Sequence, residues 1–398
     1  MYILYNLLVS LVGFFLVPAG FFNSKLRLFY QGRRTVFPFL AKELKPNTPR
    51  IWVHAASLGE YEQGLPVVKE LKSVYPNNQV LMTFFSPSGY EVKKNTTEVD
   101  VVAYLPLDTA ANCRRFLDLV QPEVAIFIKY EVWPNYMREL TKREIPAVLI
   151  SAIFNRKQIY FKPYGNFMLR ALKQFRHCFV QDKKSADLLR QVGIQNCTVS
   201  GDTRFDRVSE ILKQKDPLPL IAQFVNDEPC IVAGSTWPED EKLLVPFINQ
   251  TDKPTKFILV PHDIKKDHVE SLKKNIQKPV TTYTAMKASG EIDFKVLIVD
   301  TIGLLTRIYP FGQIAYVGGG FATGLHNTLE PAVFGIPVLI GTQFEGFREA
   351  EELVSRGGIL SVANAGELSE KLDSLMEKEE LRLSTGLINS DYIEENLG

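Results

Sequence analysis

The stretch "VHAASLGEYEQGLPVVKEL", residues 53–71, runs from a predicted buried strand into a predicted helix. Apolar residues alternate over 51–55, as in a short strand, and recur at helical spacing over 61–71. Glu60 lies between these two segments. Its carboxylate either complements the dipole of the first helical turn or acts on a substrate, and this stretch alone leaves both interpretations open.

The same alternation of strand and helix continues along the chain. Short apolar runs, typical of buried parallel strands, recur in the first half at 51–55, 79–85, 101–106, 124–129, 147–152, 177–181 and 198–200. In the second half they recur at 230–235, 256–261, 295–300, 314–319, 337–341 and 359–363. Amphipathic stretches such as 108–120 and 133–143 separate most of them. The pattern predicts two Rossmann-like α/β domains that face a cleft, with ligands beyond the carboxyl ends of the strands.

The length of the chain also favours two domains, because 398 residues exceed the usual size of a single core. Residues 213–229 carry three prolines and little periodicity, so we expect a linker there. The first domain is expected over 23–212 and the second over 230–398. No obvious final helix follows the last predicted strand.

The N-terminal segment, residues 1–22, contains no charged residue. As a helix it is about 33 Å long, enough for a hydrocarbon core of about 30 Å. A cleaved signal peptide, a membrane anchor and a buried core helix all fit such a segment, but no basic residue precedes it, which disfavours the signal peptide. Basic residues follow it, so a span would place the N-terminus outside and the remaining chain in the cytoplasm. Gly13 and Pro18 weaken a straight span, and a helix in the membrane interface stays possible.

Composition excludes several classes of function. The chain has 46 basic and 45 acidic residues, without the basic excess of a general nucleic-acid binder. Its four cysteines are scattered and form no Cys/His cluster, so neither a disulfide framework nor a zinc site is expected. We expect these cysteines to be small buried hydrophobes.

Polar residues follow several predicted strands of the first half. Glu131 ends a strand in "KYEVWPN", where it is either a neighbour of a helix start or a functional group. Arg204 in "GDTRFD" is either a structural ion pair or a partner for a phosphate or carboxylate. The other strand-end candidates of this half are Ser86, Ser88, Gly89, Asn155 and Arg156.

The second half carries a glycine-rich loop, "VGGGFATGLHNTLEPAVFGIPVLIG" at 317–341. Gly319 and Gly320 permit backbone amides to approach an anion, although such a loop is also found as a simple tight turn. Glu330 is placed to accept hydrogen bonds from a ribose. Further strand-end candidates for phosphate or nucleotide contacts are Ser235, Thr236, Pro261, His262, Ile302 and Gly303.

Together these stretches resemble the Kdo transferases, which add 3-deoxy-D-manno-oct-2-ulosonic acid (Kdo) to lipid A precursor. The resemblance covers nearly the whole chain through the apolar N-terminal segment, Arg33-Arg34, "HAASLGE", "SPSG", "EVWPN", "GDTRFD", "AGSTWPEDE" and "HNTLEPAVFGIPV". It implies a GT-B fold, CMP-Kdo as donor, the glucosamine disaccharide of lipid A precursor as acceptor, inversion of the anomeric centre and no metal or other cofactor. It also implies that the protein is located on the cytoplasmic side of the cell inner membrane.

The resemblance implies residue roles as well. It places the catalytic base on Glu60, a second carboxylate on Glu131 and a basic residue on Arg204. An ionised Glu suits the base, and an Arg suits the carboxylate of the donor. The CMP contacts that it implies are Pro261, His262, Ile302, Gly303, Leu304, Asn327, Thr328, Leu329 and Glu330.

On the acceptor side, Arg33 and Arg34 are expected to meet phosphates and anionic lipids. Three positions depart from the pattern of the family, which often has Arg at His262, Lys at Arg204 and His at Trp237.

Two other classes of protein remain as alternatives. Another sugar transferase or a UDP-sugar epimerase of the same fold shares the pattern of the second half. A non-catalytic, membrane-anchored protein that binds a nucleotide sugar is the other alternative.

Overall fold

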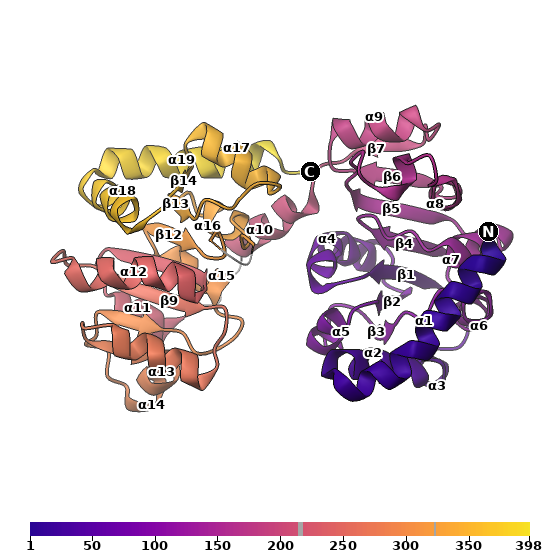
Figure 1. Ribbon diagram of the computed structural model, residues 1–398, viewed down its shortest axis with the longest axis horizontal. Coiled ribbons are helices and arrows are strands. Elements are labelled where there is room, and N and C mark those ends of the chain that lie inside the picture. The colour runs from indigo at the N-terminus through magenta and orange to yellow at the C-terminus, as the bar shows by residue number, and fades with distance from the viewer. Residues whose placement is uncertain (214–217, 322–323) are drawn as a thin grey trace. The chain divides into compact units, whose positions relative to one another are not determined.

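The computed structural model describes residues 1–213, 218–321 and 324–398. The chain forms two compact units, Met1–Arg207 with Gly398 and Val208–Leu397. Each unit is a parallel sheet covered by helices (Figure 1). Within the range expected as a linker, residues 214–217 lie outside the described residues, and 219–225 form a short helix.

Unit 1 has a parallel sheet with the strand order β3-β2-β1-β4-β5-β6-β7. Its strands are β1 (Arg50–Ala55), β2 (Gln79–Phe84), β3 (Val101–Tyr104), β4 (Val124–Ile128), β5 (Ala147–Ala152), β6 (His177–Val180) and β7 (Cys197–Val199). Its helices are α1 (Tyr2–Phe22), α2 (Ser24–Arg34), α3 (Val36–Glu43), α4 (Leu58–Val74), α5 (Pro87–Lys93), α6 (Ala110–Val120), α7 (Pro134–Lys142), η1 (Ile159–Phe161), α8 (Asn166–Leu172) and α9 (Lys183–Gln191). Helix α10 (Thr203–Lys213) runs across the division between the units.

Strand β1 shows why this sheet is covered on both faces. Ile51 and Val53 pack in one buried cluster with Tyr61 and Leu65 of α4. Trp52 points the opposite way and joins the other cluster, against residues of α6 and α7. Since side chains alternate along a strand, both sides of β1 are core, as its apolar run predicts.

Unit 2 has a parallel sheet with the order β10-β11-β9-β8-β12-β13-β14. Its strands are β8 (Cys230–Thr236), β9 (Lys256–Pro261), β10 (Val280–Thr282), β11 (Val296–Ile298), β12 (Ile314–Val317), β13 (Val338–Ile340) and β14 (Ile359–Ser361). Its helices are α11 (Pro219–Val225), α12 (Pro238–Gln250), α13 (Lys266–Asn275), α14 (Tyr283–Ser289), α15 (Leu305–Ile308), η2 (Tyr309–Phe311), α16 (Leu329–Ala332), α17 (Arg348–Arg356), α18 (Ala365–Glu377) and α19 (Glu379–Glu395).

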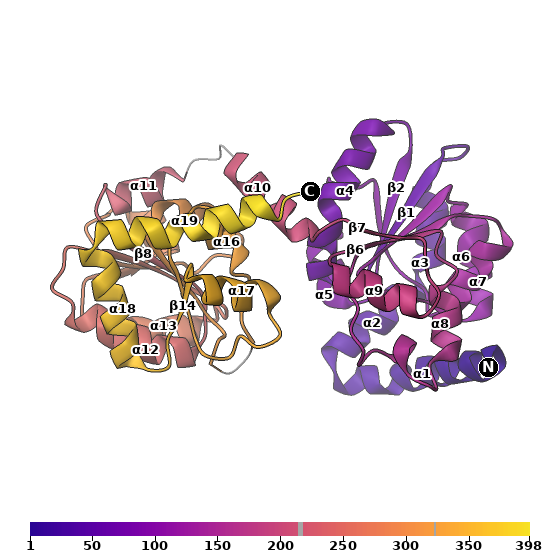
Figure 2. The same ribbon diagram turned by 90° about the horizontal axis from the view of Figure 1, so that it is seen from above.

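The predicted strands are confirmed in both units, and two elements were missed. Strand β10 is only three residues long and has two threonines, so it forms no apolar run. Helix α19 contradicts the expectation that no final helix follows the last strand, and it packs against α16, α17 and α18 (Figure 2). It was missed because Leu383 and Leu387 are exposed while Thr385 and Asn389 are buried, which blurs its apolar face.

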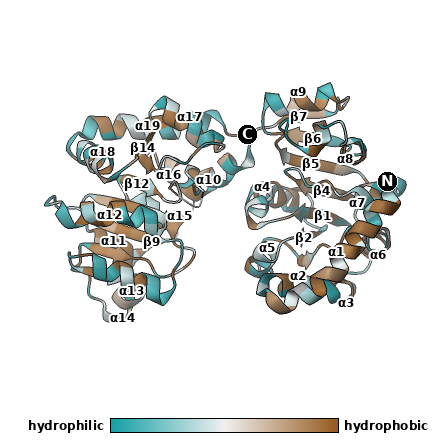
Figure 3. Ribbon diagram, viewed as in Figure 1, coloured by the Kyte–Doolittle hydropathy of each residue, from teal (hydrophilic) through white to brown (hydrophobic). Residues whose placement is uncertain are grey.

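The N-terminal helices lie along unit 1. Among the described residues, α1 is the one helix long and apolar enough to cross a membrane. Figure 3 shows the predominantly hydrophobic colouring of α1. At Asn23 the backbone is extended, and the Asn23 side chain accepts hydrogen bonds from Lys25 N and Leu26 N, so one helix ends and the next begins there. The four cysteines are free and buried, as expected.

Candidate functional site

In each unit the strand order reverses at one point. The chain leaves β1 toward β2 and β3 and then returns to place β4 on the other side of β1. In unit 2 the same reversal occurs between β8 and β12. Sheets of this kind bind ligands beyond the carboxyl ends of the two strands at such a point. Glu60 and Glu131 follow β1 and β4, and the glycine-rich loop follows β12.

Glu60 lies in the first turn of α4, and its side chain reaches back toward the end of β1. The Oε2 atom accepts hydrogen bonds from the backbone amides of Ala56 and Ser57, the latter at 3.2 Å. The interpretation as a helix-capping acid is therefore confirmed. Glu60 is nevertheless only 5% exposed, and burial together with the charge of Glu131 raises its pKa to about 7. The Ala56 amide, Lys129 and the Ser57 amide oppose that increase. A carboxyl with this pKa is suited to proton transfer near neutral pH.

Glu131 is held by two aromatic side chains. Its Oε2 atom accepts a hydrogen bond from Trp133 Nε1 at 3.1 Å and lies 3.6 Å from His54 Nε2. Trp133 also packs against the buried core of unit 1, so it has a structural role as well. Among the strand-end candidates of unit 1, Glu60 and Glu131 are thus brought to the same point of the sheet.

His54 is a residue that the sequence analysis missed. It is fully buried in β1, its Nδ1 atom lies 2.9 Å from Thr83 Oγ1, and Trp52 Nε1 donates to the same hydroxyl at 2.8 Å. His54 Nε2 has no hydrogen-bond partner within the described ranges. When Nε2 carries a proton, the Glu131 carboxylate is the acceptor that this N–H group faces. The sequence signal for His54 was a single ionisable residue inside the apolar run at 51–55.

The backbone at these strand ends is unusual. Lys129 follows β4 with φ of 70°, Ser151 lies in β5 with φ of 49°, and Ser235 lies in β8 with φ of 54°. A left-handed conformation in a non-glycine residue costs about 1–3 kcal/mol and is found disproportionately at functional sites. Lys129 stands two residues before Glu131, so the turn that presents this carboxylate is itself strained.

The loop with Ser86, Ser88 and Gly89 packs against the loop that carries Glu60. Ser86 N donates to Ala56 O at 2.7 Å, and the Ser86 hydroxyl caps α5 and lies 2.7 Å from Ser88 Oγ. At Gly89 a Cβ atom would lie 2.5 Å from the Phe84 ring and 3.2 Å from Leu58 N. The two helix starts therefore approach closely because this position has no side chain.

Arg33 has a structural environment. Its guanidinium donates to the carbonyls of Leu105, Phe85 and Phe29 at 2.7–3.0 Å, and burial lowers its pKa to about 9. Arg33 thus joins α2 to the ends of β2 and β3. Arg34 is exposed and lies over the ring of Tyr30.

The remaining first-unit candidates lie in other local contacts. Arg204 Nε donates to Asp202 at 2.8 Å. Of the two roles expected for Arg204, this contact corresponds to the structural ion pair. Asn155 and Arg156 are exposed in the loop after β5. Across the described residues, no hydrogen bond or ion pair joins Asn155 or Arg156 to Glu60 or Glu131.

Unit 2 assembles three rings at the ends of β8, β9 and β12. The Trp237 ring stacks on His262 with a centroid distance of 4.5 Å, and His262 lies 4.7 Å from His326. Trp237 Nε1 donates to His326 Nε2 at 3.0 Å. Burial and the neighbouring His262 lower the pKa of His326, which suits a neutral imidazole that accepts this bond. His262 was predicted at this position, whereas Trp237 and His326 were not candidates.

A buried carboxylate organises the glycine-rich loop. Asp240 accepts hydrogen bonds from Gly319 N at 2.9 Å, Trp237 N at 2.9 Å and the Tyr316 hydroxyl at 2.7 Å. The Gly319 amide is therefore bonded within the protein, as expected if this loop is a simple tight turn. At Gly320 a Cβ atom would lie 2.7 Å from Gly341 N, so this glycine serves close backbone packing.

Other second-unit candidates differ in exposure. The Thr236 hydroxyl is buried and donates to Glu241 at 3.1 Å, Pro261 is buried, and Ile302 is 83% exposed beside Gly303, with Leu304 half-buried.

The segment before α16 is held by its own side chains. Asn327 accepts from Leu329 N at 3.1 Å and donates to Glu330 at 3.2 Å. The Thr328 hydroxyl is buried without a hydrogen-bond partner in the described part of the chain.

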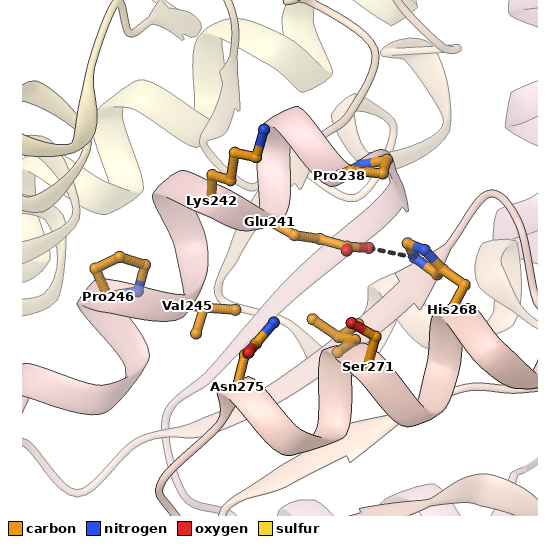
Figure 4. A pocket seen from close by; sticks show the side chains of 9 residues that line it. Pro238, Glu241, Lys242, Val245, Pro246, His268, Ser271 and Asn275 are labelled. Carbon is orange, nitrogen blue, oxygen red and sulfur yellow. Dashed lines mark hydrogen bonds and ion pairs between the residues drawn. The ribbon is translucent and has the colours of Figure 1, made fainter.

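A groove of about 470 Å³ lies between α12 and α13 (Figure 4). Glu241 accepts from His268 Nε2 at 3.0 Å and also from Thr236, so it links this groove to the end of β8. The residues lining the groove include Pro238, Lys242, Val245, Ser271 and Asn275.

Comparisons with known proteins show which family and which relatives this chain is similar to. The family described as 3-deoxy-D-manno-octulosonic-acid transferase (kdotransferase) matches residues 31–207. The 3-deoxy-D-manno-octulosonic acid transferase of Aquifex aeolicus is 31% identical over 354 residues, covering 87% of this chain and 92% of that protein. The protein of that name from Haemophilus influenzae is 28% identical over 403 residues, covering 95% and 91%.

Solved structures show the same fold at low identity. The UDP-GlcNAc 2-epimerase of Neisseria meningitidis bound to UDP-GlcNAc matches with a TM-score of 0.60 and 14% identity, covering 87% of this chain and 98% of that one. A putative UDP-N-acetylglucosamine 2-epimerase from Listeria monocytogenes matches with a TM-score of 0.58 and 12% identity, covering 87% and 94%. At these identities the likeness concerns the fold alone.

Proposed function

This chain belongs to the 3-deoxy-D-manno-octulosonic acid transferase family, and we propose that it transfers Kdo from CMP-Kdo to the glucosamine disaccharide of lipid A precursor in lipopolysaccharide biosynthesis. Membership rests on the relative that is 31% identical and of which the chain covers 92%. The observation that carries the assignment of residues is a pair of carboxylates, the buried Glu60 and the partly buried Glu131, at the reversal of strand order in unit 1.

Glu60 is the general base of this proposal. It removes the proton from the attacking hydroxyl of the acceptor, whose oxygen then forms a bond to the anomeric carbon of Kdo. The bond from that carbon to the phosphate oxygen breaks, and CMP leaves with the electron pair. One displacement of this kind inverts the anomeric centre. A pKa of about 7 keeps an appreciable fraction of Glu60 ionised at neutral pH and still able to hold the proton.

Glu131 supplies negative charge beside the base, and His54 positions it. Developing positive charge on the sugar ring is favoured by a nearby carboxylate. The fully buried His54 ring, with Nε2 3.6 Å from the Glu131 carboxylate, restricts the position of that carboxylate. His54 acts through Glu131 and is therefore a positioning residue.

CMP-Kdo binding is assigned to the strand ends of unit 2. His262 is exposed at the end of β9 and stacks on Trp237, which makes an aromatic surface next to the glycine-rich loop. Stacking on such a surface suits a nucleobase. Asn327 and Thr328 follow in the same loop, and Glu330 lies in the first turn of α16. The Thr328 hydroxyl, which has no hydrogen-bond partner among the described residues, is a candidate donor to the ligand.

The acceptor is a lipid, so we also propose association with the cytoplasmic face of the inner membrane. Helix α1 supplies the apolar surface for this association. The exposed Arg34 is the better candidate of the Arg33-Arg34 pair for a phosphate, because Arg33 already donates to three carbonyls.

The test is Kdo transfer from freshly generated CMP-Kdo to a tetra-acylated lipid A precursor. Glu60→Gln is expected to lower the rate about 10²–10⁴-fold, as for loss of a general base, with CMP affinity unchanged. Glu367→Gln is the matched control, because Glu367 occupies the same third position of α18 and accepts from Ala363 N at 3.0 Å. This variant makes the same change at a comparable helix cap and should transfer normally.

Two results would contradict the proposal. Near-normal transfer by Glu60→Gln would leave Glu60 as a capping acid and make Glu131 the candidate base. CMP binding by the wild-type protein without transfer would separate the fold of the family from its activity.

A further inference from the structure

We propose that α1 does not cross a membrane but lies in the plane of a lipid surface, held against unit 1 by polar side chains on its docked face. This inference deepens the membrane association proposed above and does not depend on the identity of the transferred sugar. The sequence leaves open whether α1 spans a membrane or lies in its interface, and this inference chooses the interface.

Polar contacts attach the first turns of α1 to unit 1. The Tyr5 hydroxyl donates to Asp108 at 2.8 Å, and Asn6 Oδ1 accepts from Ala110 N at 2.7 Å. Asn6 also lies 3.3 Å from Asn135, and Asp108 and Asn135 are each 1% exposed. We call these five residues the polar clamp. Its Asp108 further accepts from the amides at the start of α7, so the clamp belongs to the folded core of the unit.

Apolar contacts extend the docking along α1. The rings of Tyr2 and Tyr5 pack on Phe167 with centroid distances of 4.9 and 5.3 Å. Gly13 lies so close to Leu107 that a Cβ atom would be 2.8 Å from it. From residue 2 to residue 13 the docked length is about 16 Å at 1.5 Å per residue.

This docking is incompatible with a span. Residue 5 lies about 25 Å along the helix from residue 22, close to the thickness of a hydrocarbon core of about 30 Å. A spanning α1 would therefore carry Tyr5 and Asn6 to the side of the bilayer opposite unit 1. The partners of these side chains, Asp108 and Ala110, belong to unit 1 itself. The clamp and the span cannot coexist.

The face of α1 away from unit 1 is an apolar stripe that includes one exposed polar residue, Ser10. Its large exposed residues follow helical spacing and are Ile3, Leu4, Leu7, Leu8, Leu11, Phe14 and Phe15. The partly buried residues of the opposite face include Tyr2, Tyr5, Asn6, Gly13 and Leu16. Such a helix has one face for the protein and one for an apolar surrounding.

Charge identifies the occupant of this stripe as lipid rather than a second copy of the chain. Residues 1–42 contain no acidic residue, and exposed basic side chains follow α1 at Lys25, Arg27 and Arg34 in α2. Anionic headgroups complement these charges. A second copy of the chain has no acidic residue in the same segment with which to complement these charges.

The decisive measurement is the depth of spin labels on the full-length protein bound to vesicles of phosphatidylethanolamine and phosphatidylglycerol. Single cysteines replace Leu4, Leu11 and Phe15, and the four native cysteines are buried and react poorly under native conditions. An in-plane helix gives equal depths for the three labels, about 5–10 Å below the headgroups. A span gives its greatest depth at position 11, with position 4 near the opposite headgroups, and this result overturns the proposal. Labels that stay in water, with concentration-dependent cross-linking between chains, overturn it in favour of a dimer.

A pair of reciprocal variants tests the clamp independently. In Asn6→Leu the Ala110 amide loses its acceptor and should exchange hydrogen about tenfold faster in vesicle-bound protein, as for the loss of one hydrogen bond. Leu7→Asn makes the reverse change on the exposed face and should leave this exchange unchanged while weakening vesicle binding about tenfold. If Asn6→Leu leaves the Ala110 exchange rate unaltered on vesicles, the clamp is open there and the inference fails. Transfer measured in detergent micelles reports on the catalytic proposal separately.

Discussion

Replacing Glu60 by Gln should change the pH dependence of stability in a defined direction. The wild-type carboxyl has a pKa of about 7 in the folded protein, against an ordinary value of 4.5 in the unfolded chain. The folded state therefore binds the proton more tightly, and its free energy of unfolding falls as pH rises from about 4.5 through 7. Gln does not titrate, and it keeps one carbonyl oxygen for the amides of Ala56 and Ser57.

The expected size follows from the same pKa. A difference between 4.5 and about 7 corresponds to about 3 kcal/mol in the free energy of unfolding. Relative to wild type, Glu60→Gln should be equally stable near pH 4.5 and about 3 kcal/mol more stable near pH 8. Repulsion by Glu131 and attraction by Lys129 are included in the raised pKa, so both interactions are part of the predicted difference and disappear when Glu60 becomes Gln.

Urea unfolding at a series of pH values measures this difference. Trp52 and Trp133 report on unit 1 when both proteins carry Trp237→Phe, which silences the indole of unit 2. A stability difference that stays constant with pH, or a variant that is less stable than wild type at pH 8, would refute the reasoning. Glu60 would then be an ionised helix cap with an ordinary environment. The matching kinetic expectation is a transfer rate that rises with pH through about 7.

Two further predictions concern other residues. His54→Gln should lower transfer about tenfold without changing CMP affinity, because Glu131 loses the side chain that lies 3.6 Å from its carboxylate. An unchanged rate of transfer, measured from initial rates, would remove His54 from the site. Asp240→Ala should lower the stability of unit 2 by about 3 kcal/mol, since it leaves two amides and a hydroxyl without their acceptor. Asp240→Asn should cost less than about 1 kcal/mol, because an amide oxygen still accepts from Gly319 N and Trp237 N while Tyr316 accepts in turn. If Asp240→Ala and Asp240→Asn lowered the free energy of unfolding in urea equally, the hydrogen-bond explanation would be contradicted.

The fold was predictable because buried parallel strands carry their signal locally. Each of the runs at 51–55 and 124–129, for example, is apolar on both faces, and the helices between such runs show helical spacing. The position of Glu60 and Glu131 at strand ends followed from the same pattern. The short β10 and the mixed faces of α19 carry no such local signal, and they were missed.

The environment of the site was not predictable to the same degree. The contact between His54 and Glu131 depends on the pairing of β1 with β4, which brings together residues 77 positions apart in the chain. Arg33 was expected to meet a phosphate, but the carbonyls of Leu105 and Phe85 that bind it belong to strand ends far along the sequence. The partners of Tyr5 and Asn6 are likewise more than 100 positions away. Long-range contacts of this kind have no signature in a single sequence.

Asp240 makes separate segments of unit 2 depend on one side chain. It joins the start of α12, the hydroxyl of Tyr316 in β12 and the amide of Gly319. As sequences diverge, a change at Asp240 or Tyr316 leaves a buried side chain without its partner unless the other residue changes with it. Positions 240 and 316 should therefore change together through evolution, and position 319 should stay glycine because its φ is 93°. Ile302, which is 83% exposed, is free to change alone. The buried contacts of unit 2 would then be conserved together, with sequence variation concentrated at exposed positions.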